Sequence, residues 1–212
     1  MPYGFLDIAS TSKVKAAQAK NGSGDYWRDF TGERTFDRFT ENEAAFIAER
    51  DNFYMATVSE SGWPYIQHRG GPSGFLRVLN ERMLGFADFR GNRQYISIGN
   101  LAASDRVSLI LMDYAGRRRL KIYAHAEIKE VSNDPELRTL LTLPGYKAVV
   151  ERAILLHLKA FDWNCPQHII PRFTETELAS ALEPVRQRLA ELEAENKKLR
   201  QEAAESQNPS GA

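Results

Sequence analysis

The chain has 212 residues, and its 28 Lys and Arg residues balance 28 Asp and Glu residues, so its formal net charge at pH 7 is zero. A neutral chain offers no bulk electrostatic attraction to nucleic acid or to an anionic membrane surface, so neither is an expected partner. Its 42% hydrophobic and 26% charged residues are typical of a globular protein and exclude the disordered and fibrous classes. The lone cysteine, Cys165, cannot form an intrachain disulfide, and no apolar signal-peptide stretch opens the chain, so we expect a cytoplasmic protein.

Residues 1–39 mix glycines with many charges and show no sustained period, so we expect an N-terminal arm with one short helix over 12–20. A firmer helix start follows at Thr40, because Thr40 and Glu43 have the spacing of a capping box. Apolar residues then recur at helical intervals. The sequence predicts a helix over 41–51 at this point.

Aromatic and β-branched residues in extended runs, separated by short polar turns, predict seven strands. These strands are expected over 53–59, 63–69, 75–79, 82–87, 107–112, 120–131 and 153–161. Two short helices are expected between them, one from 95 to about 103 and one over 134–143 with Pro135 at its first position. Seven strands with so few helices favour a Greek-key or up-and-down barrel over an alternating parallel sheet.

The segment over 174–205 repeats apolar residues at alternating intervals of four and three, which is the heptad pattern of a coiled coil. The d positions are Leu178, Val185, Leu192 and Leu199, and the a positions are Leu182, Leu189 and Asn196. The alternative is a solvated helix whose leucines pack on the core of their own chain. Pro184 is expected to kink or restart the helix, and residues 206–212 are expected to be disordered.

Asn196 at an a position favours two parallel helices in register, at some cost in stability. In such a dimer Arg188 faces Glu193 of the other copy, and Glu195 faces Arg200 of the other copy, so both pairs attract. The sequence therefore predicts a homodimer that the C-terminal helix joins.

Two polar segments are candidates for ligand binding. Gln67, His68 and Arg69 close a predicted strand just before a pair of glycines, which lets backbone approach a ligand, although a wide turn is the alternative. Asn92-Arg93-Gln94 stands at a predicted helix start, where free N–H groups and the helix dipole favour an anion and Arg93 can add a bidentate contact. An ordinary capped helix is the alternative there. Together the two segments predict a phosphate clamp.

Cys165 and His168 are separated by two residues in another unusual polar stretch. They could form a thiolate pair or ligate a metal, but zinc needs three or four ligands, and the other histidines lie on different predicted strands. The alternative is a turn in which Cys165 is a small buried hydrophobe and His168 bonds to backbone. We expect no metal site and assign no catalytic residue.

The order of these motifs resembles the pyridoxamine 5′-phosphate oxidase-like FMN-binding split barrels, over about residues 40–172. The resemblance is carried by Gly62-Trp63-Pro64, Gln67 to Arg69, Phe86-Ala87-Asp88, Asn92-Arg93-Gln94 and Asp105-Arg106-Val107. It implies a mainly β (α+β) fold, an FMN-binding split β-barrel over 40–173, between the N-terminal helical arm and a C-terminal coiled-coil-like helix. It also implies that FMN lies between two subunits.

The resemblance places the cofactor on particular residues of this chain. The Ser-Arg-Lys block that binds the FMN phosphate in the family falls on Asn92, Arg93 and Gln94, of which only Arg93 matches in type. A strand Arg of the family falls on Gln67, and a Gln that reaches the flavin from the partner subunit falls near Arg119. These departures remove positive charge from a dianionic site, and three cationic residues can restore it, namely His68, Arg69 and Arg119.

The resemblance implies an FMN-dependent oxidoreductase that acts on a small-molecule substrate, with hydride entering at flavin N5. Residues 161–168 differ from the Trp and Arg segment that builds the pyridoxal phosphate site of the family's oxidase, so we do not expect vitamin B6 oxidation. The chain looks closer to the flavin-nucleotide-binding members of the group. Two alternatives stay open, a non-catalytic flavin- or haem-binding module and a dimeric interaction protein that uses the C-terminal coil.

Overall fold

The computed structural model describes residues 4–28 and 37–206. The chain divides into two compact units, residues 1–169, which we call the barrel unit, and residues 170–212, which we call the helical unit. Most of the segment expected to be disordered, 206–212, lies outside the described residues, as does 29–36 of the expected arm. No helix in the described part of the chain is long and apolar enough to cross a membrane.

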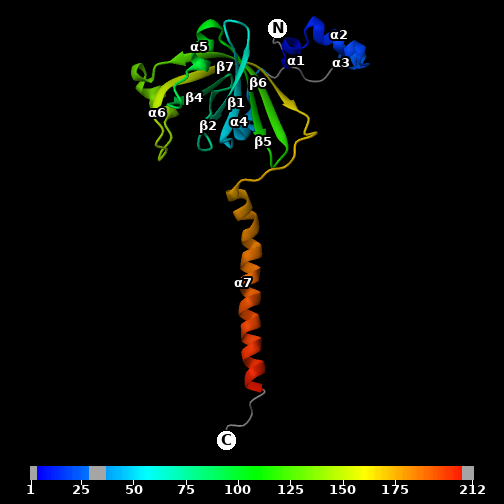
Figure 1. The fold of residues 1–212 in the computed structure, drawn as a ribbon, viewed down its shortest axis with the longest axis vertical. Coiled ribbons are helices and arrows are strands. Elements are labelled where there is room, and N and C mark those ends of the chain that lie inside the picture. The colour runs from blue at the N-terminus through cyan, green and yellow to red at the C-terminus, as the bar shows by residue number, and fades with distance from the viewer. Residues whose placement is uncertain (1–3, 29–36, 207–212) are drawn as a thin grey trace. The chain divides into compact units, whose positions relative to one another are not determined.

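The barrel unit is built on one antiparallel sheet of seven strands, so the mainly β fold class with added helices is confirmed (Figure 1). The strands are β1 Asn52–Val58, β2 Pro64–Gly70, β3 Arg77–Asn80, β4 Met83–Phe89, β5 Arg106–Asp113, β6 Arg118–Lys129 and β7 Val150–Asn164. Their order in the sheet is β2-β1-β5-β6-β7-β4-β3. The third strand begins two residues later than expected, because Phe75 first closes a turn by donating to the carbonyl of Pro72.

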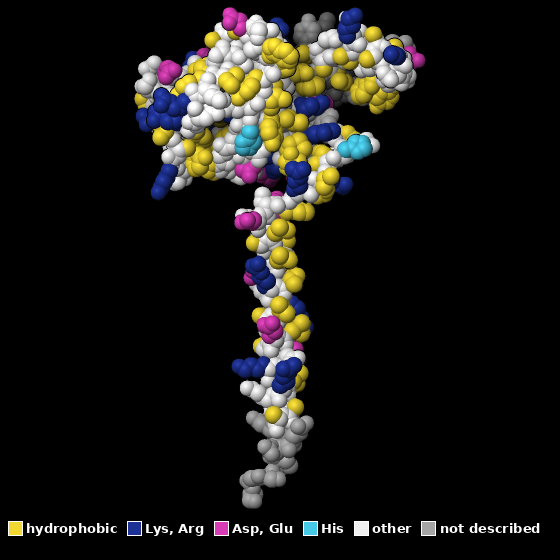
Figure 2. All heavy atoms as spheres, viewed as in Figure 1, with side chains coloured by type: hydrophobic (Ala, Val, Ile, Leu, Met, Phe, Trp, Pro, Cys, Tyr) yellow, Lys and Arg dark blue, Asp and Glu magenta, His cyan; other side chains and the backbone are white. Residues whose placement is uncertain are grey.

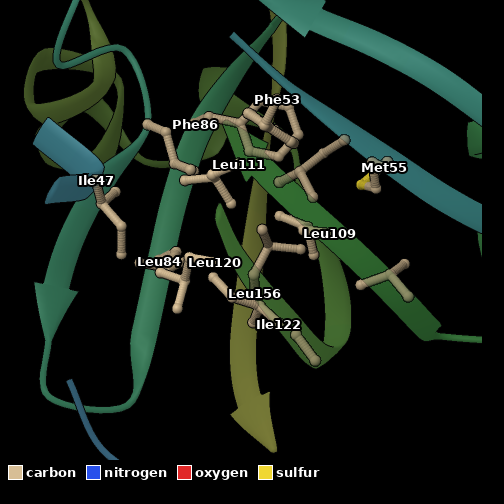
Figure 3. Packing of buried hydrophobic residues seen from close by; sticks show 14 of the residues in the cluster. Ile47, Phe53, Met55, Leu84, Phe86, Leu109, Leu111, Leu120, Ile122 and Leu156 are labelled. Atoms are coloured by element: carbon tan, nitrogen blue, oxygen red, sulfur yellow. The ribbon is translucent and has the colours of Figure 1, made fainter. Parts of the chain in front are cut away.

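The hydrophobic core packs against this sheet, and buried residues alternate with less buried ones along β1 and β5, whereas β4 buries five residues in a row. On β1 every second residue is buried, namely Phe53, Met55 and Thr57, which is the period-two pattern of a strand with one face in the core. Figure 3 shows Ile47 and the side chains of the central strands gathered in one cluster. The labelled members are Ile47, Phe53, Met55, Leu84, Phe86, Leu109, Leu111, Leu120, Ile122 and Leu156.

The helices of the barrel unit lie between the strands and in the N-terminal arm. They are α1 Phe5–Ala9, α2 Ser12–Lys20, α3 Gly24–Arg28, α4 Glu41–Ala48, α5 Ile96–Ala103, η1 Val131–Asn133 and α6 Pro135–Leu141. The expected single helix of the arm is therefore wrong, since three are present in residues 4–28. Each of α1 and α3 has only five residues, too few to show a period. Phe5 of α1 stacks on Tyr123 with ring centroids 4.5 Å apart, and Lys121 Nζ lies 4.7 Å from the centre of the same Phe5 ring.

Glu43 fixes α4 to the sheet through four hydrogen bonds on one carboxylate. Its Oε2 accepts from the Thr40 backbone N–H at 3.0 Å and from the Thr40 hydroxyl at 2.6 Å, as the capping box predicts. Its Oε1 accepts from Asn42 at 3.1 Å and from Trp163 Nε1 of β7 at 2.8 Å. Burial alone would raise the pKa of Glu43, but these hydrogen bonds outweigh it and lower the pKa below its ordinary value.

The helical unit contains one long helix, α7 Glu175–Ser206, as its only helix or strand within residues 170–206. Thr174 and Glu177 form its capping box, with the Thr174 N–H donating to Glu177 Oε2 at 2.7 Å. The helix runs through Pro184 without ending, so the expected restart at this residue is wrong. A proline removes one backbone donor and crowds one carbonyl, and the remaining hydrogen bonds of a 32-residue helix continue on both sides.

We expect Glu43→Gln to lower the free energy of unfolding at pH 7 by about 2 kcal/mol, because a charged acceptor of four donors is lost. Since the pKa of Glu43 is lowered by folding, its stabilisation is present above the unfolded-state pKa and is lost as the pH falls through the folded-state pKa. The stability difference from the natural chain should therefore shrink below about pH 4.3.

Urea unfolding of both proteins at pH 7, 5 and 4 measures this difference. Glu41→Gln is the matched control, because Glu41 lies in the same first turn but is exposed. A deficit for Glu43→Gln that stays constant across this pH range would contradict the role given to the carboxylate.

Candidate functional site

A polar hollow of about 200 Å³ lies where β2, β4 and the start of α5 meet, and we call it the β2–α5 hollow. Gln67 and Arg69 enter it from β2, and Asp88 enters it from β4. Its other lining residues are Tyr65, Phe89, Gly91, Asn92, Arg93, Gln94, Tyr95, Ile96, Ile98 and Glu151. The two polar segments that the sequence singled out therefore share one site.

The loop that carries Asn92, Arg93 and Gln94 into the hollow is held in a strained conformation. Arg93 and Tyr95 both have left-handed backbone, with φ of 62° and 52°, which costs a non-glycine residue about 1 kcal/mol or more. The Asn92 side chain supports the turn, since its Oδ1 accepts from the Gln94 backbone N–H at 3.1 Å. Strain of this kind collects at ligand sites, where the surrounding structure holds it in place.

Helix α5 begins in the hollow without a side-chain cap. Its N-cap residue is Tyr95, whose side chain makes no capping hydrogen bond, so the first-turn amides of Ile96, Ser97 and Ile98 have no side-chain acceptor there. Two buried hydrogen bonds fix the helix to the sheet, Ser97 Oγ to Gln67 Oε1 at 2.6 Å and Asn100 Nδ2 to Thr57 at 2.9 Å. A rigid, uncapped helix start of this kind favours an anion.

A buried carboxylate holds two arginines at the floor of the hollow. Asp88 is only 4% exposed; one of its oxygens accepts from Arg69 Nη1, and the other accepts from Arg152 Nη1 at 3.3 Å. Arg69 Nε is buried and has no hydrogen-bond partner among the described residues. A buried donor without an acceptor is costly, so this atom marks a place where a ligand oxygen fits.

Glu151 links three residues at the rim of the hollow through hydrogen bonds. Its Oε1 accepts from Arg90 Nε at 3.0 Å and from the Tyr95 hydroxyl at 3.1 Å, and its Oε2 accepts from Arg152 at 3.2 Å. Burial would raise the pKa of Glu151, but the hydrogen bonds from Arg90 and Tyr95 lower it, so this carboxylate is ionised at neutral pH. Together with Arg93, the hollow and its rim carry four guanidinium groups and two carboxylates.

This donor set fits a phosphate monoester. Four positive and two negative charges leave a net charge of +2, which matches the charge of about −1.5 to −2 on a phosphate monoester at neutral pH. The unpartnered Arg69 Nε and the uncapped amides of α5 add directed donors to that charge. The side chain of Gln67 uses its oxygen for Ser97, so its NH₂ group is what it can offer a ligand.

Two of the predicted cofactor-binding residues do not line the hollow. His68 lies between Gln67 and Arg69 on β2, so its side chain is on the opposite face of the sheet, where its ring contacts Tyr54 at 5.5 Å between centroids. Arg119 is at the start of β6, opposite Met112 of β5, and is absent from the lining of the hollow in its own chain.

Sequence reasoning missed Asp88, Glu151 and Arg152 as members of this site. The signal for Asp88 was its place between Ala87 and Phe89, since a lone carboxylate in an apolar strand needs a buried partner. Its partner could not be read from the sequence, because Asp88 and Arg152 meet only through the register of β4 against β7.

Cys165 and His168 stand apart from the hollow. Cys165 is exposed, and its sulfur accepts from the Gln167 backbone N–H at 3.5 Å, while His168 has left-handed backbone with φ of 65°. Cys165 is thus not the buried hydrophobe of the turn interpretation. Among residues 4–28 and 37–206, no group of three or more His, Cys, Asp or Glu side chains is placed to hold a metal ion.

We expect Asp88→Asn to lower the free energy of unfolding by about 3 kcal/mol, because two buried guanidinium groups would lose their counter-charge. Urea unfolding at pH 7 measures the change. Asp162→Asn is the matched control, since Asp162 pairs across β6 and β7 with Lys121 at 2.8 Å but is partly exposed, and it should cost less than about 1 kcal/mol. Equal losses for the two variants would show that burial of the Asp88 cluster adds nothing.

Comparison with known proteins identifies the family of this chain. The family model described as pyridoxamine 5′-phosphate oxidase matches residues 39–160, more than half of the chain, and a search of curated proteins found no match. Similar solved structures include a candidate pyridoxamine 5′-phosphate oxidase from Lactobacillus delbrueckii, with 20% identity and a TM-score of 0.46 over 59% of this chain and 94% of that one. HupZ of Group A Streptococcus has 13% identity and a TM-score of 0.45 over 64% and 99% of the two chains. An F420 reductase has 18% identity and a TM-score of 0.39 over 55% and 93%. On the strength of the family match over 39–160, the chain belongs to the pyridoxamine 5′-phosphate oxidase family.

Proposed function

We propose that the β2–α5 hollow binds the phosphate of FMN and that the protein is an FMN-dependent oxidoreductase acting on a small molecule. One observation carries the proposal: Arg69, whose buried Nε has no partner among the described residues, lines the same hollow as Arg93 and the uncapped start of α5. Family membership supports it. FMN, when bound, supplies hydride transfer, and the protein supplies binding and orientation.

Each residue of the hollow has a part in holding the phosphate. Arg69 is the preorganised donor, because Asp88 fixes its guanidinium and leaves Nε for the ligand. Arg93 is the exposed donor at the mouth, and the first amides of α5 complete the cradle. Arg152 and Glu151 position their neighbours and need not touch the ligand.

The flavin ring requires more space than this hollow gives. A volume of about 200 Å³ is below the roughly 300–1,000 Å³ of sites that enclose a drug-sized ligand, so the hollow suits the phosphate end alone. The barrel unit also exposes an apolar hairpin, where Val58 is 43%, Trp63 76% and Ile66 66% exposed. Exposed apolar surface of this kind marks an interface, so we propose that a second copy covers it and completes the FMN site.

We expect Arg93→Ala to weaken FMN binding by roughly 10- to 100-fold, because a charge-assisted hydrogen bond to phosphate is lost. Titration of the apo protein with FMN, followed by flavin fluorescence, measures the dissociation constant. Arg117→Ala is the matched control: Arg117 is also exposed with left-handed backbone, φ 53°, but lies outside the hollow. A folded Arg93→Ala protein with unchanged affinity would remove Arg93 from the site.

The same titration separates the cofactor classes. Tighter binding of haem than of FMN would overturn the flavin proposal, and tighter binding of F420 would replace FMN by a deazaflavin. Turnover of reduced nicotinamides and of pyridoxamine phosphate by the FMN-loaded protein separates an enzyme from a carrier, with a flavin reductase as the positive control. If the protein turned over neither compound while the reductase was active, the result would favour a flavin carrier over an enzyme that acts on these substrates.

A chain ending at Phe173 should retain FMN, because the hollow is built from the barrel unit alone. Flavin content and light scattering of the shortened protein check this. Loss of flavin from a folded shortened chain would mean that the helical unit contributes to the site. A shortened chain that is monomeric yet fully loaded with flavin would contradict a site shared by two subunits.

A further inference from the structure

Helix α7 exposes a continuous apolar stripe along its length. Six side chains recur at heptad positions, and each is 45–62% exposed: Leu178, Leu182, Val185, Leu189, Leu192 and Leu199. Figure 2 shows hydrophobic side chains running along the helix beside charged ones. Because α7 is the only helix or strand of residues 170–206, nothing within that part of the chain covers the stripe. A surface helix of a soluble protein does not normally leave such a stripe in water.

We propose that α7 pairs with α7 of a second copy of this chain in a parallel, in-register, two-stranded coiled coil. The apolar spacing averages 3.5 residues, which is the repeat that keeps one seam facing a partner helix. Pro184 falls at a c position, outside the a and d seam, so its ring does not stand between the helices. The apolar stripe of α7 can therefore pack against the same stripe of a second copy.

Charge complementarity also fits a second copy. In the parallel arrangement Arg188 at g faces Glu193 at e of the other copy, and Glu195 at g faces Arg200 at e, so both pairs attract. Arg188 also pairs within its own helix with Glu191 at 2.9 Å, but both side chains are about two-thirds exposed, and such a pair is weak enough to exchange.

Asn196 selects the parallel direction. In the antiparallel register that places Leu189 against Leu192, Arg188 faces Glu195, so charge alone does not exclude that pairing. The same register places Asn196 against Val185, where its buried amide has no partner. In the parallel register Asn196 faces its own copy, and the two amides bond to each other. The seam therefore specifies two parallel chains.

Cysteine crosslinking in the full-length protein tests this proposal. In a Cys165→Ser background, Leu182→Cys and Leu199→Cys should each crosslink efficiently to their own copies under mild oxidation. Lys198→Cys, at a c position outside the seam, is the matched control and should crosslink poorly. A mixture in which Leu182→Cys links only to Leu199→Cys would show an antiparallel pair. That result, or crosslinking no better than the control, would overturn the proposal.

Exchanging the charges of Glu195 and Arg200 gives a second test. The reporter cysteine is placed at position 182, far along the helix from both changed residues. With Leu182→Cys as reporter, Arg200→Glu should slow crosslinking roughly two- to fivefold, because Glu195 would face a like charge. Adding Glu195→Arg should restore the rate. In the antiparallel register Arg200 faces no charged residue, and Glu195→Arg would repel Arg188, so rescue occurs only in the parallel dimer. A double variant no faster than either single variant would overturn the proposal.

Discussion

The buried carboxylate of Asp88 is the contact on which the rest of the site depends. It lies in an apolar strand, and only the two guanidinium groups of Arg69 and Arg152 make its burial tolerable. That requirement fixes β4 against β7 at the residue where the α5 loop leaves the sheet, and it fixes Arg69 so that one donor is turned to no protein acceptor. The geometry of the hollow therefore depends on the two arginines that compensate the buried charge of Asp88.

The proposed phosphate site contains no lysine among the residues that line it. The hollow and its rim contain an ion network, in which Glu151 and Asp88 pair with three arginines, Arg69, Arg90 and Arg152. With Arg93 at the mouth, the net charge is +2. Carboxylates inside an anion site lower its affinity, but they hold the guanidinium groups in one geometry, so less rotamer freedom is lost on binding. The left-handed backbone at Arg93 and Tyr95 is consistent with a site built for position rather than for charge alone.

Local signals in the sequence predicted much of this fold, but they did not predict the contacts between elements that are distant in the sequence. The capping box at Thr40 and the alternation along β1 each depend on neighbouring residues, and both are present in the structure. The helix at α4 ends at Ala48 instead of 51, because β1 begins at Asn52. Treating Gln67, His68 and Arg69 as one ligand-binding run ignored the alternation that separates their side chains. The pairing of Asp88 with Arg152, and of Glu43 with Trp163, depends on register and packing, which no local pattern contains.

The two proposed contacts between copies are linked by mass action. In the proposed dimer, the hollow of about 200 Å³ and the exposed apolar hairpin of each copy would form half of a flavin site, so cofactor binding and barrel pairing would stabilise each other. The proposed coil through α7 would make that pairing intramolecular within the dimer, so that an effective concentration set by the linking segment would replace the protein concentration. Pairing of the barrel units would then no longer depend on the amount of protein present. The loss of coil stability caused by the polar Asn196 would then matter little, because the proposed barrel contact would also hold the two chains together.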